Sequence, residues 1–138
     1  MLRIVYSSVA TKPFSGDELL DLLDEARRSN ELMDVTGMLL YRHGKFLQVL
    51  EGAEATVESL FEKISTDPRH HTCKVLDREI VERREFGDWS MGFENLDEVE
   101  AGEIPGATDF LTHPFDSDFF QQESTRAMTL LNLFKVRV

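Results

Sequence analysis

The sequence predicts an α+β fold, a ferredoxin-like core with the order βαββαββ, followed by a C-terminal helical extension. Short runs alternate apolar and polar residues, which is the period of a half-buried strand. They are interleaved with two longer stretches whose apolar residues recur every three to four positions, as in an amphipathic helix. A mostly antiparallel sheet with both helices on one face fits this order.

The first half of the chain is predicted to supply a strand, a helix and a hairpin. Residues 2–8 alternate as a strand does, and Ser15 is a suitable N-cap for a helix over residues 17–30. The apolar runs 35–41 and 45–51 are separated by three residues that end in a glycine, which indicates a hairpin turn. We therefore expect these two runs to be adjacent antiparallel strands.

The second half continues the same pattern and then changes character. An apolar stripe from Val57 to Ile64 predicts a second helix, which Pro68 prevents from extending. Two more strands are expected within residues 73–81 and 89–93. We accordingly divide the chain into a core, residues 1–93, and an extension, residues 94–138.

The extension begins with an acidic stretch that contains glycines and a proline, for which we expect a loop or short helix up to residue 112. From residue 117 the pattern is helical again. Its apolar residues are Phe120, Ala127, Leu130, Leu131 and Phe134. A lone helix cannot hide such a stripe, so we expect it to pack on the free face of the sheet and on a second copy of the chain.

Composition excludes several classes of partner. The 138 residues suit one globular domain, and 26 acidic residues against 15 lysines and arginines give a net charge of −11. This charge disfavours nucleic acids and acidic membrane surfaces. Cys73 is the single cysteine, so no internal disulfide can form. With no leader peptide and no long apolar span expected, the cytoplasm is the predicted compartment.

Three polar residues lie on predicted faces that are otherwise apolar. Burying an unpaired amide or hydroxyl there costs roughly 1–3 kcal/mol of stability. Gln48 shares a strand face with apolar neighbours, Tyr6 shares its face with Leu2 and Ile4, and Asn30 continues the apolar stripe of the first helix. A heteroaromatic ligand held between the helices and the sheet satisfies all three.

Other interpretations of these residues stand beside this one. A strand tyrosine is commonly a core residue, and an asparagine ending a helix is commonly a C-cap. His70, His71 and Cys73 offer zinc-binding atoms, but no second ligand pair lies at a conventional spacing, so we expect no metal. A small flavin-dependent or acyl-group enzyme needs a nucleophile or general base that these residues do not offer. A ligand-free interaction module leaves a buried glutamine unexplained.

Several spaced motifs resemble the BLUF family of flavin-binding blue-light sensors, in the family's order. They are Tyr6-Ser7-Ser8, Val35-Thr36-Gly37-Met38-Leu39-Leu40-Tyr41, Phe46-Leu47-Gln48-Val49-Leu50-Glu51-Gly52, Asp67-Pro68-Arg69-His70 and Trp89-Ser90-Met91-Gly92-Phe93. The resemblance covers residues 2–93.

The resemblance implies a role for each candidate residue. Tyr6 would donate an electron and a proton to the excited flavin, and Gln48 would bridge the phenol and the flavin ring. Asn30 would hydrogen-bond the polar edge of the ring, and Ser29 stands where relatives often carry a second amide or an imidazole. The remaining implied residues are Leu22, Leu39 and Ile64 on the ring faces, Lys63 near the flavin, and Trp89 and Met91 in signal relay.

The function implied is a photoreceptor rather than an enzyme. FAD is the expected cofactor, with FMN or riboflavin able to occupy the same ring site. Light would rearrange the hydrogen bonds of Gln48 and give a red-shifted signalling state, which the C-terminal helices or a partner protein would receive. We also expect a homo-oligomer, a dimer or larger, and an unidentified downstream protein.

Overall fold

Eight elements follow one another in the part of the chain that the computed structural model describes, residues 1–87, 90–96 and 126–136. They are β1 (Leu2–Ala10), α1 (Gly16–Met33), β2 (Thr36–Arg42), β3 (Lys45–Gly52), α2 (Glu54–Ser65), β4 (His70–Ile80), β5 (Gly92–Asn95) and α4 (Arg126–Val136). The order confirms the predicted α+β arrangement. None of the helices described is long and apolar enough to cross a membrane.

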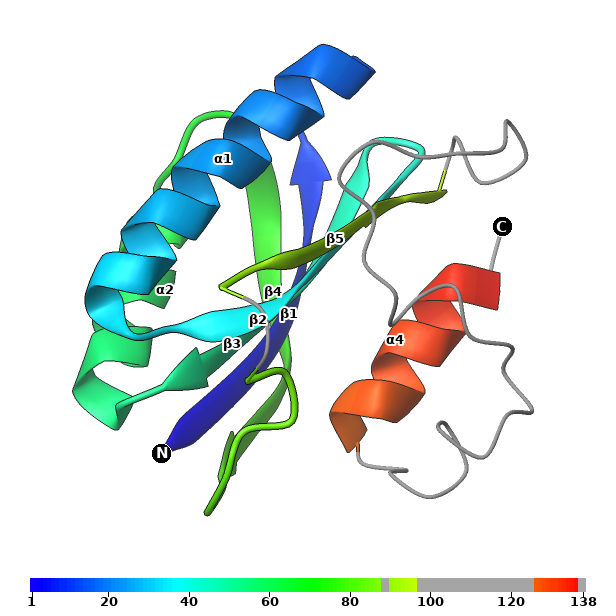
Figure 1. Cartoon of the computed structure of the whole chain (residues 1–138). Coiled ribbons are helices and arrows are strands. Elements are labelled where there is room, and N and C mark those ends of the chain that lie inside the picture. Colours follow the sequence, from blue (N-terminus) through cyan, green and yellow to red (C-terminus); the bar gives the residue numbers. More distant parts are fainter. Residues whose placement is uncertain (88–89, 97–125, 137–138) are drawn as a thin grey trace.

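The strands form one sheet in the order β4-β1-β3-β2-β5 (Figure 1). β1 pairs antiparallel with both β3 and β4, and β2 pairs antiparallel with β3. β5 lies parallel to β2 at the edge of the sheet. The sheet is therefore mostly antiparallel, as predicted.

The hairpin between β2 and β3 is tighter than predicted, because the strands reach Arg42 and Lys45 and leave only His43 and Gly44 in the turn. The φ angles of these two residues are 47° and 75°. Positive φ at both central positions is the geometry of a type I′ turn, which matches the twist of the flanking strands.

The first helix is longer than predicted. Ser15 caps its start as expected, since the Ser15 hydroxyl accepts from Glu18 N–H at 3.1 Å and the Glu18 carboxylate accepts from Ser15 N–H at 3.0 Å. Its end lies at Met33 rather than at residue 30, because Asp34 takes the left-handed conformation that closes the helix. Asn30 is therefore an interior residue of α1, and reading it as a C-cap is wrong.

The last two strands also differ in their limits. β4 begins at His70, three residues earlier than predicted, because its pairing with β1 continues as far as Ala10. β5 begins at Gly92, where its pairing with Met38 starts. Met91 consequently precedes the strand in which it was expected.

Two apolar clusters cover the two faces of the sheet. α1 and α2 lie on one face, where Leu2, Ile4, Leu19, Leu23 and Leu50 are among the buried residues (Figure 1). α4 lies on the opposite face, where Ala127 and Leu131 pack with Val5, Val49 and Phe86. Leu130 and Phe134 are partly buried against that second cluster. Phe120, Trp89 and residues 97–112 of the acidic stretch lie outside the described residues. The start of that stretch was predicted to be a loop, but β5 continues to Asn95, so the predicted boundary at residue 93 falls inside this strand.

A buried ion pair fixes the segment that connects β4 to β5. The Glu51 side chain is fully buried and accepts from Arg3 Nε at 3.0 Å, and from the backbone N–H groups of Glu85 and Phe86 at 2.8 Å each. Arg84 also donates to the Glu51 carbonyl at 3.1 Å. These bonds hold the connection against the sheet and place the Phe86 ring in the cluster beneath α4.

We expect Glu51→Gln to lower the free energy of unfolding by about 3–5 kcal/mol, because it leaves the Arg3 guanidinium buried without its main counter-charge. Chemical denaturation measures the loss. Glu79→Gln is the matched control, since Glu79 lies 3.6 Å from Arg3 but is 36% exposed, and its loss is expected to stay below about 1 kcal/mol. Equal losses in the two variants would contradict this account.

Candidate functional site

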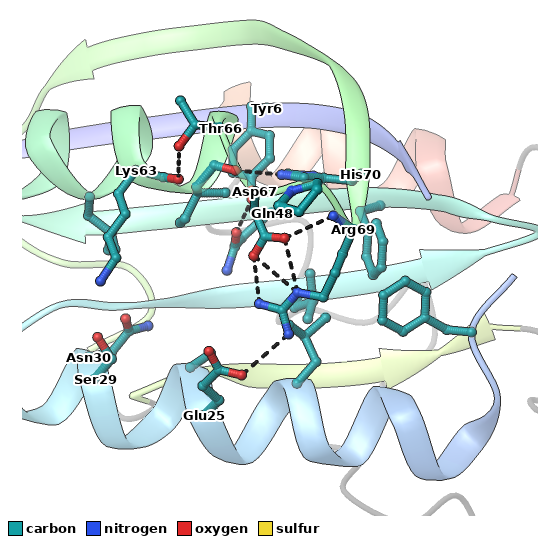
Figure 2. A pocket seen from close by; sticks show the side chains of 18 residues that line it. Tyr6, Glu25, Ser29, Asn30, Gln48, Lys63, Thr66, Asp67, Arg69 and His70 are labelled. Carbon is teal, nitrogen blue, oxygen red and sulfur yellow. Dashed lines mark hydrogen bonds and ion pairs between the residues drawn. The ribbon is translucent and has the colours of Figure 1, made fainter. Parts of the chain in front are cut away.

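A cavity of about 630 Å³ opens between α1, the sheet and the end of α2 (Figure 2). Its lining combines apolar and aromatic side chains with nine polar or charged ones besides Tyr6. Small-molecule sites likewise join apolar walls to polar groups that orient the ligand. The lining residues are Tyr6, Phe14, Leu22, Glu25, Ala26, Ser29, Asn30, Leu39, Phe46, Gln48, Leu60, Lys63, Ile64, Thr66, Asp67, Pro68, Arg69 and His70.

Tyr6 and Gln48 meet because β1 and β3 place them directly opposite each other in register. Opposed residues of an antiparallel pair have neighbouring side chains on one face. The Tyr6 hydroxyl donates a hydrogen bond to Gln48 Oε1, and Gln48 Nε2 donates to Met91 Sδ at 3.6 Å. The glutamine therefore connects the phenol on one side to the segment before β5 on the other.

The Tyr6 phenol is held in its protonated form. The side chain is buried, with the Phe61 ring centroid 5.1 Å from its own. Burial raises the pKa of the phenol far above its ordinary value, and the nearby acidic groups of Cys73 and Asp67 raise it further. Tyr6 thus remains a hydrogen-bond donor to Gln48 across the physiological pH range.

Asn30 reaches the cavity from the interior of α1. It is buried, and its Nδ2 donates to the Ser90 carbonyl at 2.9 Å. Its backbone carbonyl accepts from Val35 N–H at 2.9 Å, which fixes the helix end to the start of β2. The side-chain amide consequently faces the cavity while it also holds the segment that leads into β5.

The structure brings the other predicted cofactor-binding residues to the same cavity. Ser29 and Leu22 come from α1, Leu39 from β2, and Lys63 and Ile64 from α2. Met91 is fully buried and contacts Gln48 without lining the cavity, and Trp89 lies outside the described residues.

A cluster of three charged residues in the cavity lining, Glu25, Asp67 and Arg69, was missed by reasoning from the sequence. Arg69 donates to both oxygens of Asp67, and its Nη1 lies 3.3 Å from Glu25 Oε2 across on α1 (Figure 2). The hydrogen bond with Arg69 lowers the pKa of Asp67 and raises that of the guanidinium. The signal was present in the motif Asp67-Pro68-Arg69-His70, which follows the end of α2 and lines the cavity at all four positions.

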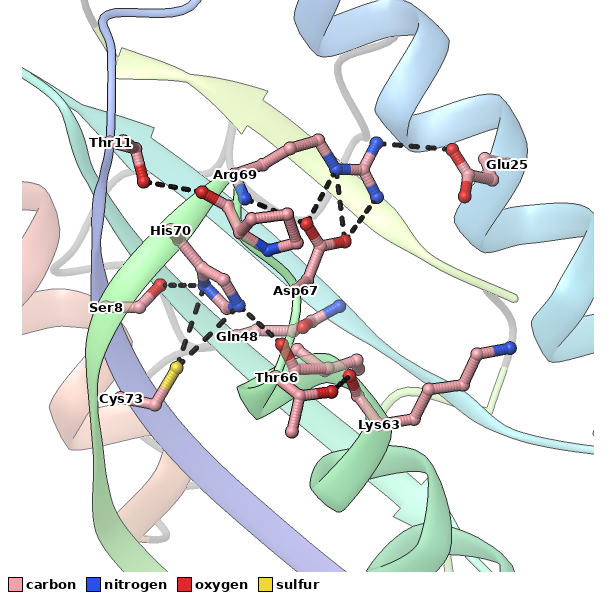
Figure 3. Close-up of polar contacts among 12 residues, drawn as sticks. Ser8, Thr11, Glu25, Gln48, Lys63, Thr66, Asp67, Arg69, His70 and Cys73 are labelled. Atoms are coloured by element: carbon pink, nitrogen blue, oxygen red, sulfur yellow. Dashed lines mark hydrogen bonds and ion pairs between the residues drawn. The ribbon is translucent and has the colours of Figure 1, made fainter.

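His70 was weighed from the sequence only as a zinc ligand, but it lines the cavity, and both of its ring nitrogens are engaged (Figure 3). Nε2 lies 2.6 Å from the Ile64 carbonyl and Nδ1 lies 2.8 Å from Ser8 Oγ. Because a carbonyl oxygen only accepts, the neutral ring carries its hydrogen on Nε2 and accepts from the Ser8 hydroxyl.

The predicted absence of metal concerned His70, His71 and Cys73. Cys73 Sγ lies 3.7 Å from each ring nitrogen of His70, whereas His71 bonds to Thr72 Oγ1 on the exposed side of β4. Burial raises the pKa of the Cys73 thiol, which disfavours the thiolate that zinc requires. Over the described residues, no group of three such side chains could hold an ion.

A flavin ring system suits the chemistry of this cavity. The ring is flat and apolar on its faces, and Leu22, Leu39 and Ile64 offer apolar walls. Its polar edge carries carbonyl and N–H groups, and the amides of Asn30 and Gln48 can both donate and accept. The volume also lies within the range of about 300–1,000 Å³ that ligand cavities occupy.

Comparison with known proteins gives several relatives whose names refer to light, two of which show how much of each protein the chain covers. The chain is 36% identical over 99 residues to the photoactivated adenylate cyclase subunit alpha of Euglena gracilis, which covers 70% of this chain and 10% of the relative. It is 37% identical over 91 residues to the blue light- and temperature-regulated antirepressor BluF of Escherichia coli, 66% of this chain and 23% of the relative. The chain thus corresponds to a small part of either protein.

Solved structures resemble a larger share of the chain. The dark-state structure of BlrB, a BLUF protein, has a TM-score of 0.68 at 27% identity, and the match covers 94% of this chain and 96% of BlrB. Klebsiella pneumoniae BlrP1 with FMN and cyclic diGMP has a TM-score of 0.72 at 30% identity, covering 98% of this chain and 34% of BlrP1.

The family model of BLUF, described as sensors of blue-light using FAD, matches residues 1–92, two thirds of the chain. That match includes β1 through β4 and every residue that lines the cavity. The chain belongs to the BLUF family of flavin-binding blue-light sensors.

Proposed function

We propose that this chain senses light through Tyr6 and Gln48, and that it relays the signal without catalysing a net reaction. The observation that carries the proposal is the buried chain of hydrogen bonds from the Tyr6 hydroxyl through the Gln48 amide to Met91. It joins a potential electron and proton donor at the cavity to a segment at the edge of the sheet.

Residues around the cavity would hold the cofactor. Leu22, Leu39 and Ile64 would pack on the ring faces, and Asn30 with Ser29 would bind the polar edge. Lys63 would supply positive charge at the cavity for the phosphate-bearing end of FAD or FMN, whereas the charge of Arg69 is balanced by Asp67 and Glu25. The chemistry that a bound flavin supplies is the absorption of blue light and the uptake of one electron.

With a flavin bound, Tyr6 would supply that electron, and its phenolic proton would pass to the flavin by way of Gln48. The Tyr6 hydroxyl already donates to Gln48 Oε1, so the transfer would need no diffusion of water or of a side chain. Both the electron and the proton would return to Tyr6 at the end of the cycle. The protein is therefore unchanged in composition after each cycle.

What persists is a new arrangement of the Gln48 amide. A thioether is a weak acceptor, so breaking the hydrogen bond from Gln48 Nε2 to Met91 Sδ costs little free energy. The Tyr6 hydroxyl can accept as well as donate, and it can thus serve either end of the amide. Two arrangements of similar free energy give the bistable element that a switch requires.

An enzyme on this scaffold is disfavoured by the state of its ionisable groups. The His70 ring nitrogens are both engaged, and Asp67 is paired with Arg69. A general base must be free to take a proton from a substrate. We infer that the chain is not a catalyst and passes its signal to a separate protein, with a second copy of the chain as part of the assembly.

We expect Tyr6→Phe and Gln48→Leu to retain flavin and to lose the red shift of flavin absorption under blue light. The first variant removes the proton donor and the second removes the amide that rearranges. Absorption spectra before and after illumination test this. Tyr41→Phe is the matched control, because the Tyr41 hydroxyl accepts from Phe14 N–H and lies outside the cavity lining. A normal light response in Tyr6→Phe would exclude Tyr6 as the donor.

Stability in darkness should fall at alkaline pH because of Tyr6. The pKa of Tyr6 is raised in the folded protein, so folding favours the protonated phenol. The contribution of Tyr6 to the free energy of unfolding is therefore complete below about pH 10. It is lost as the pH rises above that value, because the phenol ionises in the unfolded chain but not in the folded protein. The expected slope is up to about 1.4 kcal/mol per pH unit. Denaturation at increasing pH measures it, and Tyr6→Phe should flatten the slope. Parallel curves for wild type and variant would refute the assignment.

Asn30→Ala should weaken flavin retention several-fold, since it removes a hydrogen bond whose contribution is about 0.5–1.5 kcal/mol. The measurement is the fraction of flavin that stays bound after serial dilution. Ser29→Ala serves for comparison, because a small hydroxyl at the same rim should contribute less than the amide. Unchanged retention in Asn30→Ala would remove it from the cofactor contacts.

A further inference from the structure

The segment that leads into β5 is attached to α1 by two side chains. Arg27 Nε donates to the Met91 carbonyl at 2.9 Å, and Asn30 Nδ2 donates to the Ser90 carbonyl at 2.9 Å. Arg27 and Asn30 are three positions apart on α1, so they point to the same side of the helix. Two consecutive carbonyls of the segment are thus held by two neighbouring helix residues.

Among the residues that the structure describes, three side-chain hydrogen bonds reach Ser90 and Met91. β5 has four residues and pairs with β2 at the edge of the sheet (Figure 1). The Met91 side chain is fully buried and receives the weak hydrogen bond from Gln48. Of the three side-chain bonds to Ser90 and Met91, the one from Arg27 alone carries a formal charge, and charge-assisted bonds are roughly twice as strong as neutral ones.

Of the three side chains that bond to Ser90 and Met91, Arg27 is the one that does not line the cavity. Asn30 and Gln48 both line the cavity, whereas Arg27 does not. A change of hydrogen bonding around the cofactor therefore alters two of the three contacts and leaves the third in place.

We propose that Arg27 is a positioning residue that retains the Ser90–Met91 segment on α1 and so keeps the Met91 sulfur within reach of Gln48. When Gln48 leaves Met91, the Arg27 bond decides how far the backbone before β5 can move. Its effect on the light response rests on the proposed function, whereas its effect in darkness does not.

The test uses the flavin-loaded full chain in darkness, with ¹³C at methionine carbonyls and ¹⁵N at glycines. Met91–Gly92 is the single Met–Gly pair in the sequence, so one carbonyl-to-amide correlation reports on the Met91 carbonyl. Arg27→Gln should shift this carbonyl resonance upfield as its hydrogen bond is lost. Amide exchange of residues 92–95 should become at least about tenfold faster.

Arg28→Gln is the matched control. The substitution and the charge change are identical, but Arg28 is exposed and its Nε bonds within α1 to the Asp24 carbonyl at 3.4 Å. It should leave the Met91 carbonyl signal and β5 exchange as in wild type. Arg27→Lys keeps the charge with a single donor nitrogen and should restore part of the protection, which a loss of helix packing alone would not predict.

The outcomes are distinguishable. A wild-type Met91 carbonyl signal and wild-type β5 exchange in Arg27→Gln would overturn the role of Arg27, as would the same changes in Arg28→Gln. Under blue light, wild type should show faster β5 exchange, and Arg27→Gln should show a smaller increase because its segment is already released. If wild type shows no light effect, the proposed function fails, and the dark comparison still decides the role of Arg27.

Discussion

The Gln48 amide has a donor end and an acceptor end inside an apolar core, and each end needs a partner there. Tyr6 satisfies the oxygen and the Met91 sulfur satisfies the nitrogen. The two partners differ greatly in strength, because a phenol is a strong donor and a thioether a weak acceptor. The amide oxygen of Gln48 is therefore held by a strong hydrogen bond, and the amide nitrogen by a weak one that is easily broken.

The sheet gives this amide access to two layers of the molecule. Gln48 faces α1, α2 and the cavity, whereas its strand neighbours Leu47 and Val49 face α4. The connection from β4 to β5 crosses between the layers, with Phe86 under α4 and Met91 against Gln48. This connection therefore has side chains in the packing of both faces of the sheet, which is the arrangement that the proposed relay requires.

The two ends of the segment that connects β4 to β5 are held by different kinds of contact, one of which is harder to break than the other. Near Phe86 it is held by the fully buried Glu51, whose partners are a guanidinium and two backbone amides. Near Met91 it is held by the partly exposed Arg27 and by amides that also serve the cavity. The first arrangement resists change because breaking it strands a buried charge, and the second does not.

Local pattern was enough to predict the order of strands and helices, the cap at Ser15, and Tyr6, Gln48 and Asn30 as polar residues on buried faces, because alternation and helical spacing report which side chains share a face. It could not give the end of α1 or the start of β5, which depend on the conformation of Asp34 and on pairing with Met38. Nor could it show that Arg69 reaches Glu25, that His70 meets Ser8, or that Arg27 holds Met91. Each of those contacts joins residues more than forty positions apart, and only the packing of the helices on the sheet brings them within hydrogen-bonding distance.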